Sequence, residues 1–353
     1  MAATGHIIGR ETELALLADF LDNLPGQPRA LLVEGEAGIG KTVVWRAGLE
    51  AARERGLHVL SARASASDVR LSFAGLGDLV SPVLGEVLPR LPVPQRKAVE
   101  AALLLREAEG RRPDRRAVGL AFLSALRVLA REHPTVVAVD DLQWLDLPSA
   151  RVLEFALRRL EAEPVGLLAA VRASPGSAVP FGLDRAFIDE RMERVSLPAL
   201  TLAALYELLR TRLGVKLPRP ALLRIHEASG GNPFYALEIG RELERREVRP
   251  APGEPLPIPV NLRALLHERV ERLPRRVREL LLAASLLSNP TAHILVELGG
   301  GGQQVERDLE RALSAGVIEV EGESVRFSHP LLAAAARAEA SPLQRRAMHR
   351  RIA

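Results

Sequence analysis

Short apolar runs alternate with stretches of helical periodicity over the first 200 residues. The runs that predict buried strands cover residues 29–33, 57–63, 135–140, 165–172 and 192–197. Apolar residues at helical spacing predict helices over 41–54, 116–131 and 149–160, the last with Ser149 as N-cap. Strands that alternate with helices predict an α/β fold, a parallel sheet covered by helices on both faces.

The strand signal ends near residue 198, and the rest of the chain is predominantly helical. Helices are predicted over 201–213 with Thr201 as N-cap, 218–240 with a break at 229–233, 262–273, 275–287, 292–298 and 303–315. Two short strands, 317–320 and 324–328, then predict a hairpin. Three helices followed by a hairpin suggest a winged-helix domain, whereas the Pro- and Arg-rich residues 81–116 give no clear pattern.

Five prolines lie between residues 249 and 259, at positions 250, 252, 255, 257 and 259. So many prolines keep a chain stiff and extended. The segment therefore predicts a linker at a domain boundary.

Composition narrows the class of protein. The 353 residues predict two or three domains, and 47% hydrophobic with 26% charged residues is the balance of a globular chain. The absence of cysteine excludes disulfides, cysteine zinc sites and thiol nucleophiles. No apolar run reaches the ~18–20 residues that span a bilayer, and the first thirty residues carry no signal-peptide pattern. We therefore expect a cytoplasmic protein without membrane contact.

The net charge of +4 could suggest a nucleic-acid partner, but the excess is small, 48 basic against 44 acidic residues. All but three of the basic residues are arginine. An arginine-rich background from a GC-rich genome explains this charge as well as a nucleic-acid surface does.

The segment from Gly35 to Thr42, Gly-Glu-Ala-Gly-Ile-Gly-Lys-Thr, fits the phosphate-loop pattern G-x-x-x-x-G-K-[ST]. It follows a predicted strand and opens a predicted helix, as the motif requires. Its glycines let backbone N–H groups turn toward phosphate oxygens, and the helix N-terminus adds its positive end. Lys41 is then expected to reach the β- and γ-phosphates, and the Thr42 hydroxyl to ligate Mg²⁺.

A second strand, residues 135–139, ends in two carboxylates, Asp140 and Asp141. This suits a Walker B segment, in which Asp140 would hold Mg²⁺ and Asp141 would orient or deprotonate the attacking water. Arg172 ends the next predicted strand, on the ligand side of a parallel sheet, and could sense the γ-phosphate.

Four segments resemble STAND-type AAA+ ATPases, and in particular the large ATP-binding LuxR-type transcription regulators. Residues 6–14, His-Ile-Ile-Gly-Arg-Glu-Thr-Glu-Leu, resemble the opening signature that lies beside the adenine in that family. Residues 140–146, Asp-Asp-Leu-Gln-Trp-Leu-Asp, resemble the Walker B segment of the LuxR-type regulators, which usually carry His in place of Gln143. Residues 230–234 resemble the Gly-x-Pro motif of the helical lid, and residues 327–332 the end of the winged helix.

The resemblance implies a P-loop domain over 1–198, a helical lid over 199–250, a linker over 251–259, and a winged-helix domain with the start of a following helix over 260–353. By the resemblance, Pro233 packs near the base and sugar and His329 touches the β-phosphate. The nucleotide-binding residues expected from motif and resemblance together are Ile8, Gly9, Arg10, Gly35, Glu36, Ala37, Gly38, Ile39, Gly40, Lys41, Thr42, Val43, Pro233 and His329. The expected catalytic residues are Lys41, Asp141 and Arg172, and the expected Mg²⁺ ligands are Thr42 and Asp140.

The resemblance also implies a switch that binds ATP and ADP. ADP would hold the domains closed, an unidentified inducer ligand or protein and ATP would open them for self-association, and slow ATP hydrolysis would reset the state. This is the module of a regulator without its C-terminal LuxR-type DNA-binding domain. A steady-turnover AAA+ ATPase of the origin-recognition or loader type, acting on DNA, is the alternative, and a nucleotide-independent scaffold is disfavoured by the intact phosphate loop.

The third helix of the predicted winged helix, residues 303–313, carries three acidic residues and two arginines, and the hairpin adds Glu319, Glu321 and Glu323. Contacts with DNA phosphates need a positive surface. We therefore expect this segment to pack against the protein and not to bind DNA.

Overall fold

The computed structural model of the protein divides into two compact units, residues 1–198 and 199–353. It describes residues 7–65, 68–105, 114–172, 178–187, 191–214, 217–245, 260–287, 290–300, 302–327 and 330–352. The predicted proline-rich linker, 251–259, lies outside these ranges.

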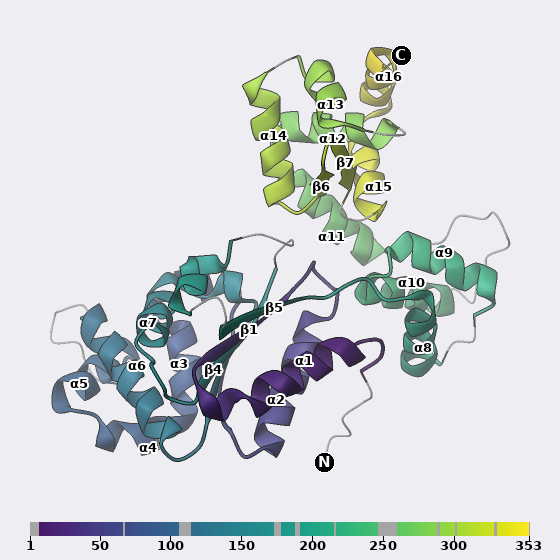
Figure 1. Ribbon diagram of the computed structural model, residues 1–353. Coiled ribbons are helices and arrows are strands. Elements are labelled where there is room, and N and C mark those ends of the chain that lie inside the picture. Colours follow the sequence, from purple (N-terminus) through teal and green to yellow (C-terminus); the bar gives the residue numbers. More distant parts are fainter. Residues whose placement is uncertain are drawn as a thin grey trace. The chain divides into compact units, whose positions relative to one another are not determined.

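Five parallel strands form the centre of the first unit (Figure 1). They are β1 (Arg29–Glu34), β2 (His58–Arg63), β3 (Thr135–Asp140), β4 (Val165–Val171) and β5 (Met192–Ser196). Their order across the sheet is β2-β3-β4-β1-β5. The predicted parallel sheet is confirmed, and the predicted strand bounds differ by no more than one residue. Because all the strands run the same way, their carboxyl ends lie along one edge.

Helices cover both faces of this sheet (Figure 1). They are α1 (Glu11–Asp22), α2 (Lys41–Glu54), α3 (Ala74–Val80), α4 (Leu84–Val87), α5 (Val93–Ala102), α6 (Arg115–Ala130) and α7 (Leu147–Leu157). Short 3-10 turns are η1 (Leu24–Gly26), η2 (Asp68–Arg70), η3 (Ser81–Val83), η4 (Leu88–Arg90), η5 (Leu142–Trp144) and η6 (Pro180–Ala186).

Alternate residues of β1 enter two different cores. Leu31 and Val33 pack with α1 and α2, whereas Ala30 and Leu32 pack with α3, α6 and α7. Side chains of a strand point alternately to its two faces, so this alternation buries the sheet on both sides.

The residues that gave no clear sequence pattern form α4, α5 and the turns around them. Several of these short elements begin with a proline in their first turn. Leu76, Val87, Leu91 and Val99 pack with Phe122 of α6 in one core. Packing against α6, not local periodicity, therefore fixes this segment.

Asp146 joins two distant parts of the first unit. Its buried carboxylate accepts hydrogen bonds from the backbone N–H groups of Phe73 (2.9 Å), Gly75 (3.0 Å) and Ser149 (3.0 Å). It is thus the N-cap of α7, and the expectation of Ser149 as N-cap is wrong, because α7 already begins at Leu147 with Pro148 in its first turn. The Ser149 hydroxyl instead accepts from the N–H of Leu76 at 2.8 Å.

The second unit is helical apart from one hairpin. Its elements are α8 (Leu202–Leu213), α9 (Arg219–Ser229), α10 (Pro233–Arg245), α11 (Val260–Glu271), α12 (Arg275–Leu286), α13 (Ala292–Leu298), α14 (Gln303–Ser314), β6 (Ile318–Glu321), β7 (Ser324–Phe327), α15 (Pro330–Glu339) and α16 (Pro342–Ile352). Thr201 caps α8 as predicted, its hydroxyl accepting from the N–H of Ala204. β6 and β7 are antiparallel, and Thr291, just before α13, forms an antiparallel bridge with Ser324.

No helix within the described part of the chain combines the length and apolar character that crossing a bilayer would require.

Removing the Asp146 carboxylate should destabilise the first unit strongly. Asp146→Ala leaves the buried amides of Phe73 and Gly75 without their acceptor and removes a helix cap, so we expect a loss of about 3 kcal/mol in the free energy of unfolding. Both tryptophans of the chain, Trp45 and Trp144, lie in the first unit. Urea unfolding followed by tryptophan fluorescence therefore measures this unit.

The matched control is Asp114→Ala. Asp114 caps α6 by accepting from the exposed N–H of Arg116. We expect about 1 kcal/mol there. Equal losses in the two variants would contradict the anchoring role of Asp146.

Candidate functional site

The loop from Gly35 to Gly40 connects β1 to α2 at the carboxyl edge of the sheet. Gly35, Gly38 and Gly40 have φ of 151°, 83° and 111°, a region that residues with a Cβ rarely adopt. A Cβ on Gly35 would also lie 2.9 Å from Cγ2 of Ile39. The glycines therefore allow a tight loop that residues with a Cβ would strain, as the phosphate-loop pattern predicts.

Lys41 is buried and bends over this loop. Its ammonium group donates to the carbonyl oxygens of Gly35 (2.8 Å) and Glu36 (2.7 Å). Burial, and secondarily the positive charge of Arg172, lowers the pKa of Lys41 to about 8, although nearby acidic groups oppose the shift. The lysine is thus a cation held inside the loop at an energetic cost that a phosphate would relieve.

The two expected magnesium ligands lie together. The Thr42 hydroxyl, at the start of α2, donates to Oδ1 of Asp140 at 3.2 Å. Burial and the charge of Asp141 raise the pKa of Asp140, while the Thr42 hydrogen bond and Arg63 lower it. A hydroxyl and a carboxylate are oxygen donors of the kind Mg²⁺ prefers, so these residues fit that ion.

Asp141 lies beside Asp140 in a left-handed backbone conformation, with φ of 52° and ψ of 50°. Oδ1 of Asp141 accepts a hydrogen bond from Nε2 of Gln143 (2.7 Å) and lies 3.8 Å from Nε of Arg172. Oε1 of Gln143 in turn accepts from the backbone N–H of Arg172 at 3.0 Å. Gln143 therefore connects the end of β3 with the end of β4 and holds the Asp141 carboxylate in place.

Arg10, at the N-terminus of α1, is 4% exposed and supports the loop from outside. Its guanidinium donates to the carbonyl oxygens of Ile39 (2.9 Å) and Pro198 (2.8 Å) and lies 3.4 Å from Glu13. Ile39 belongs to the phosphate loop, and Pro198 is the last residue of the first unit. One buried side chain thus joins the loop to the segment by which the chain leaves this unit.

The other residues expected to contact the nucleotide do not lie together in the phosphate loop. Ile8 and Gly9 lie directly before α1 and are half-buried, and Val43 is 45% exposed in the first turn of α2. Pro233 lies in the second unit, where it begins α10, and His329 lies outside the described residues.

Sequence reasoning missed Arg63, which ends β2 at the same edge. Its Nε lies 3.6 Å from Oδ2 of Asp140. It lines an open cleft of about 380 Å³ with Ala64, Ser65, Asp140, Asp141 and Trp144. The signal was available, because Arg63, like Arg172, is an arginine at the carboxyl end of a predicted strand.

Comparisons with known proteins agree with this geometry. Residues 6–169 match the sequence profile of the AAA ATPase domain family. An uncharacterized protein of Rhizobium meliloti (strain 1021) is 29% identical over 196 residues, covering 49% of this chain and 19% of its own length. The chain therefore spans about a fifth of that relative.

Two solved structures with TM-scores above 0.5 share the fold. The Walker-type ATPase PabY2304 of Pyrococcus abyssi matches with a TM-score of 0.62 and 16% identity, covering 94% of this chain and 96% of its own. The Aeropyrum pernix ORC2 protein matches with a TM-score of 0.55 and 18% identity, covering 99% and 96%. A STAND protein with a tetratricopeptide repeat sensor from Pyrococcus horikoshii matches with a TM-score of 0.44 and 17% identity. The match covers 99% of this chain and 45% of that protein's chain.

A domain of the matched family implies nucleotide binding, typically with Mg²⁺. With its parallel five-stranded sheet and the loop at Gly35–Thr42, the first unit has a P-loop NTPase fold, and residues 6–169 of it match the AAA ATPase domain family.

Proposed function

We propose that the chain is an ATP/ADP switch of the STAND type, the nucleotide-dependent module of a LuxR-type transcription regulator, and that slow ATP hydrolysis resets it. The observation that carries this proposal is the state of Asp141. Its carboxylate accepts a 2.7 Å hydrogen bond from Gln143 and lies 3.8 Å from Arg172. A carboxylate held by these two contacts must be released before it can act on the attacking water, which favours slow hydrolysis over steady turnover.

The same contacts supply the energy difference that a switch needs. The side chain of Arg172 carries a single positive charge, for which Asp141 and a γ-phosphate would compete. ADP leaves Arg172 beside Asp141, whereas ATP offers it a phosphate and releases the carboxylate toward the attacking water. Two nucleotides that differ in this contact bind the two arrangements with different affinity.

Thr42 and Asp140 would hold Mg²⁺, which neutralises phosphate charge when bound. Lys41 would leave the carbonyl oxygens of Gly35 and Glu36 and turn toward the phosphates. Through Arg10, a change of the phosphate loop at Ile39 reaches Pro198, where the chain passes into its second unit. These contacts support signal transmission from the nucleotide to the remainder of the chain.

In this proposal α8–α10 form the helical lid and the proline-rich residues 251–259 the linker. α12, α13 and α14, with the Thr291–Ser324 bridge and the β6–β7 hairpin, have the element order of a winged helix. Asn232, before Pro233, caps α10 by accepting from the N–H of Phe234. The proposal also includes an unidentified inducer ligand or protein that opens the switch, and self-association of the chain in the ATP state. It places the protein in the cytoplasm.

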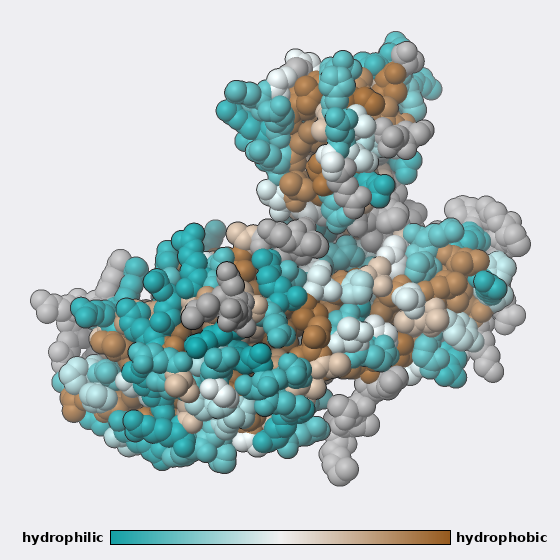
Figure 2. Space-filling model, viewed as in Figure 1, coloured by the Kyte–Doolittle hydropathy of each residue, from teal (hydrophilic) through white to brown (hydrophobic). Residues whose placement is uncertain are grey.

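The second unit is proposed as a packing module that does not bind DNA. Asp308 of α14 is 3% exposed and pairs with Arg276 (3.5 Å) and Arg311 (3.3 Å). Part of the positive charge near α14 is therefore neutralised within the protein. Figure 2 shows hydrophilic side chains over the outer face of this helix, and those at its surface include Glu306 and Glu310.

ATP and ADP affinities of Arg172→Ala test the switch. Losing the contact with the γ-phosphate should lower the preference for ATP over ADP about tenfold, with ADP affinity unchanged. Equilibrium binding of labelled nucleotides measures this. Arg151→Ala, which removes an exposed arginine paired with Glu154 on α7, is the control and should keep the wild-type preference.

Hydrolysis in the same proteins separates a switch from a steady-turnover enzyme. Wild-type turnover should take many minutes, Asp141→Asn should bind nucleotide without hydrolysing it, and Lys41→Ala should bind none. Turnover of about one per second would place the chain among ordinary AAA+ enzymes. Normal hydrolysis by Asp141→Asn would show that Asp141 does not act on the water.

Nucleotide binding should raise the pKa of Lys41 and take up a proton. At pH 8 about half of the lysines are neutral in the free protein, and phosphate contacts favour the charged form. We expect ADP binding in EDTA to take up about half a proton at pH 8 and almost none at pH 6.5.

Calorimetry in buffers of different ionisation enthalpy measures this uptake. Lys41→Arg is the matched control, because arginine stays charged and should remove the uptake at pH 8. Equal uptake by the wild-type protein at both pH values would contradict the prediction.

The chain should give no tight duplex-DNA complex in a mobility-shift assay at low salt, where phosphate contacts are strongest. The exposed arginines of α14 provide the check. Tight binding that is lost in Arg307→Glu and Arg311→Glu would overturn the prediction and make this helix a DNA contact.

A further inference from the structure

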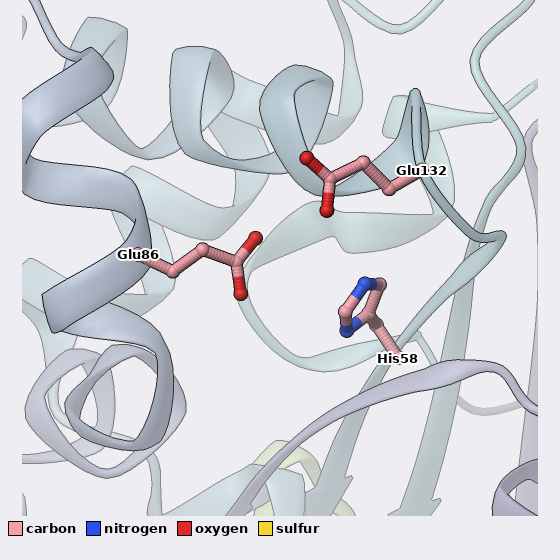
Figure 3. Close-up of side chains that lie close together, drawn as sticks. All are labelled: His58, Glu86 and Glu132. Carbon is pink, nitrogen blue, oxygen red and sulfur yellow. The ribbon is translucent and has the colours of Figure 1, made fainter.

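Three side chains that could ligate a metal converge at the amino end of β2 (Figure 3). This end of the strand is opposite to the carboxyl edge of the sheet, where the phosphate loop lies. His58 begins β2, Glu86 lies on α4, and Glu132 lies in the turn between α6 and β3. One ligand atom from each lies within 4.8 Å of the others. The three residues therefore surround a common centre, although they come from segments far apart in the sequence.

Two atoms of this group are buried without a hydrogen-bond partner. They are Nε2 of His58 and Oε1 of Glu86. Leaving a buried polar atom unpaired is costly, most of all for a carboxylate oxygen. In Figure 3 the carboxylate of Glu86 points toward the His58 ring, so one cation between them would satisfy both atoms.

We propose that His58, Glu86 and Glu132 form a site for a divalent transition-metal ion, with Zn²⁺ as the ion of best fit. One imidazole nitrogen and two carboxylates match zinc chemistry, whereas Mg²⁺ and Ca²⁺ prefer oxygen donors alone. Zinc bonds of about 2.0–2.2 Å require the side chains to close in slightly from their present spacing. Three protein ligands leave one position of a tetrahedral ion for water.

The neighbouring charges fit this assignment. Glu132 also pairs with Arg90, so a metal would take one carboxylate oxygen and leave the other to the arginine. The ring of His133 lies edge-on to that of His58, with centroids 5.4 Å apart. With the ion bound, α4 and the α6–β3 turn would be joined to the start of β2, so the ion would stabilise the first unit.

A second His/Glu cluster differs from this one in the pairing of its carboxylate. His267, Glu271 and Glu339 of the second unit also lie within 4.8 Å of one another. There Glu339 pairs with both His267 (3.3 Å) and Arg278 (3.4 Å). Its carboxylate is thus satisfied by protein partners, unlike Oε1 of Glu86.

The test is a titration of the tag-free, chelator-treated full chain with Zn²⁺, followed by calorimetry and thermal unfolding. We expect one equivalent of Zn²⁺ that raises the Tm of the first unit by a few degrees. Co²⁺ should bind in its place and show the visible absorption of a low-coordinate site. His58→Asn and Glu86→Gln should each weaken binding about 100-fold or more and abolish the Tm shift.

Glu132→Gln, at a partly exposed turn, gives a variant with little risk to folding, and it should also weaken binding. His349→Ala, an exposed histidine of α16, is the matched control and should bind as the wild type does. Absence of Zn²⁺ binding to the wild-type chain would overturn the proposal. Unchanged binding by folded Glu86→Gln and Glu132→Gln would overturn it equally.

Discussion

The close approach of α2 to β4 is the contact on which the geometry of the phosphate site depends. β4 separates β1, which carries the phosphate loop, from β3, which carries Asp140. Two strand spacings make this gap about 10 Å. Gly48 of α2 lies against β4, and a Cβ there would come within 2.6 Å of Cδ2 of Leu168. Because the helix lies this close, Thr42 at its start can reach across β4 to Asp140.

At the carboxyl edge of the sheet, positive and negative side chains neutralise one another. Lys41, Arg63 and Arg172 face Asp140 and Asp141, and each arginine lies within 4 Å of one carboxylate. A phosphate arriving here enters a network that is already paired, and it must exchange partners with the carboxylates. In the proposed switch, the affinity for a nucleotide would be the difference between two sets of ion pairs, and it would therefore depend on the number of phosphates.

An element could be predicted from the sequence where the residues that determine it are close together along the chain. The five strands are buried apolar runs, and the phosphate loop and Asp140 belong to contiguous motifs, so both could be found from neighbouring residues alone. The helices over residues 81–102 could not, because they depend on packing against Phe122 and its neighbours. α1 was not predicted, although its buried residues Leu17, Phe20 and Leu21 recur at helical spacing and the signal is local.

In the candidate site, too, the residue types could be predicted from the sequence, whereas their contacts could not. The residue types at Asp141 and Arg172 indicated chemistry, but only the fold shows that Gln143 bridges them. Asp146 ends the segment that resembles the Walker B segment of the LuxR-type regulators, and its contacts with Phe73 and Gly75 show that it anchors structure. Arg63 became visible once β2 was found next to β3.

The hydrogen bonds from Lys41 to Gly35 and Glu36 have a kinetic consequence. The lysine satisfies two carbonyl oxygens of the loop before any phosphate is present, so the loop is ordered in advance. A nucleotide that enters need not bear the entropy of folding the loop around itself. In the proposed switch, association would then be limited by diffusion and one lysine rotation, and ATP and ADP would differ in the lifetimes of their complexes, not in their rates of formation.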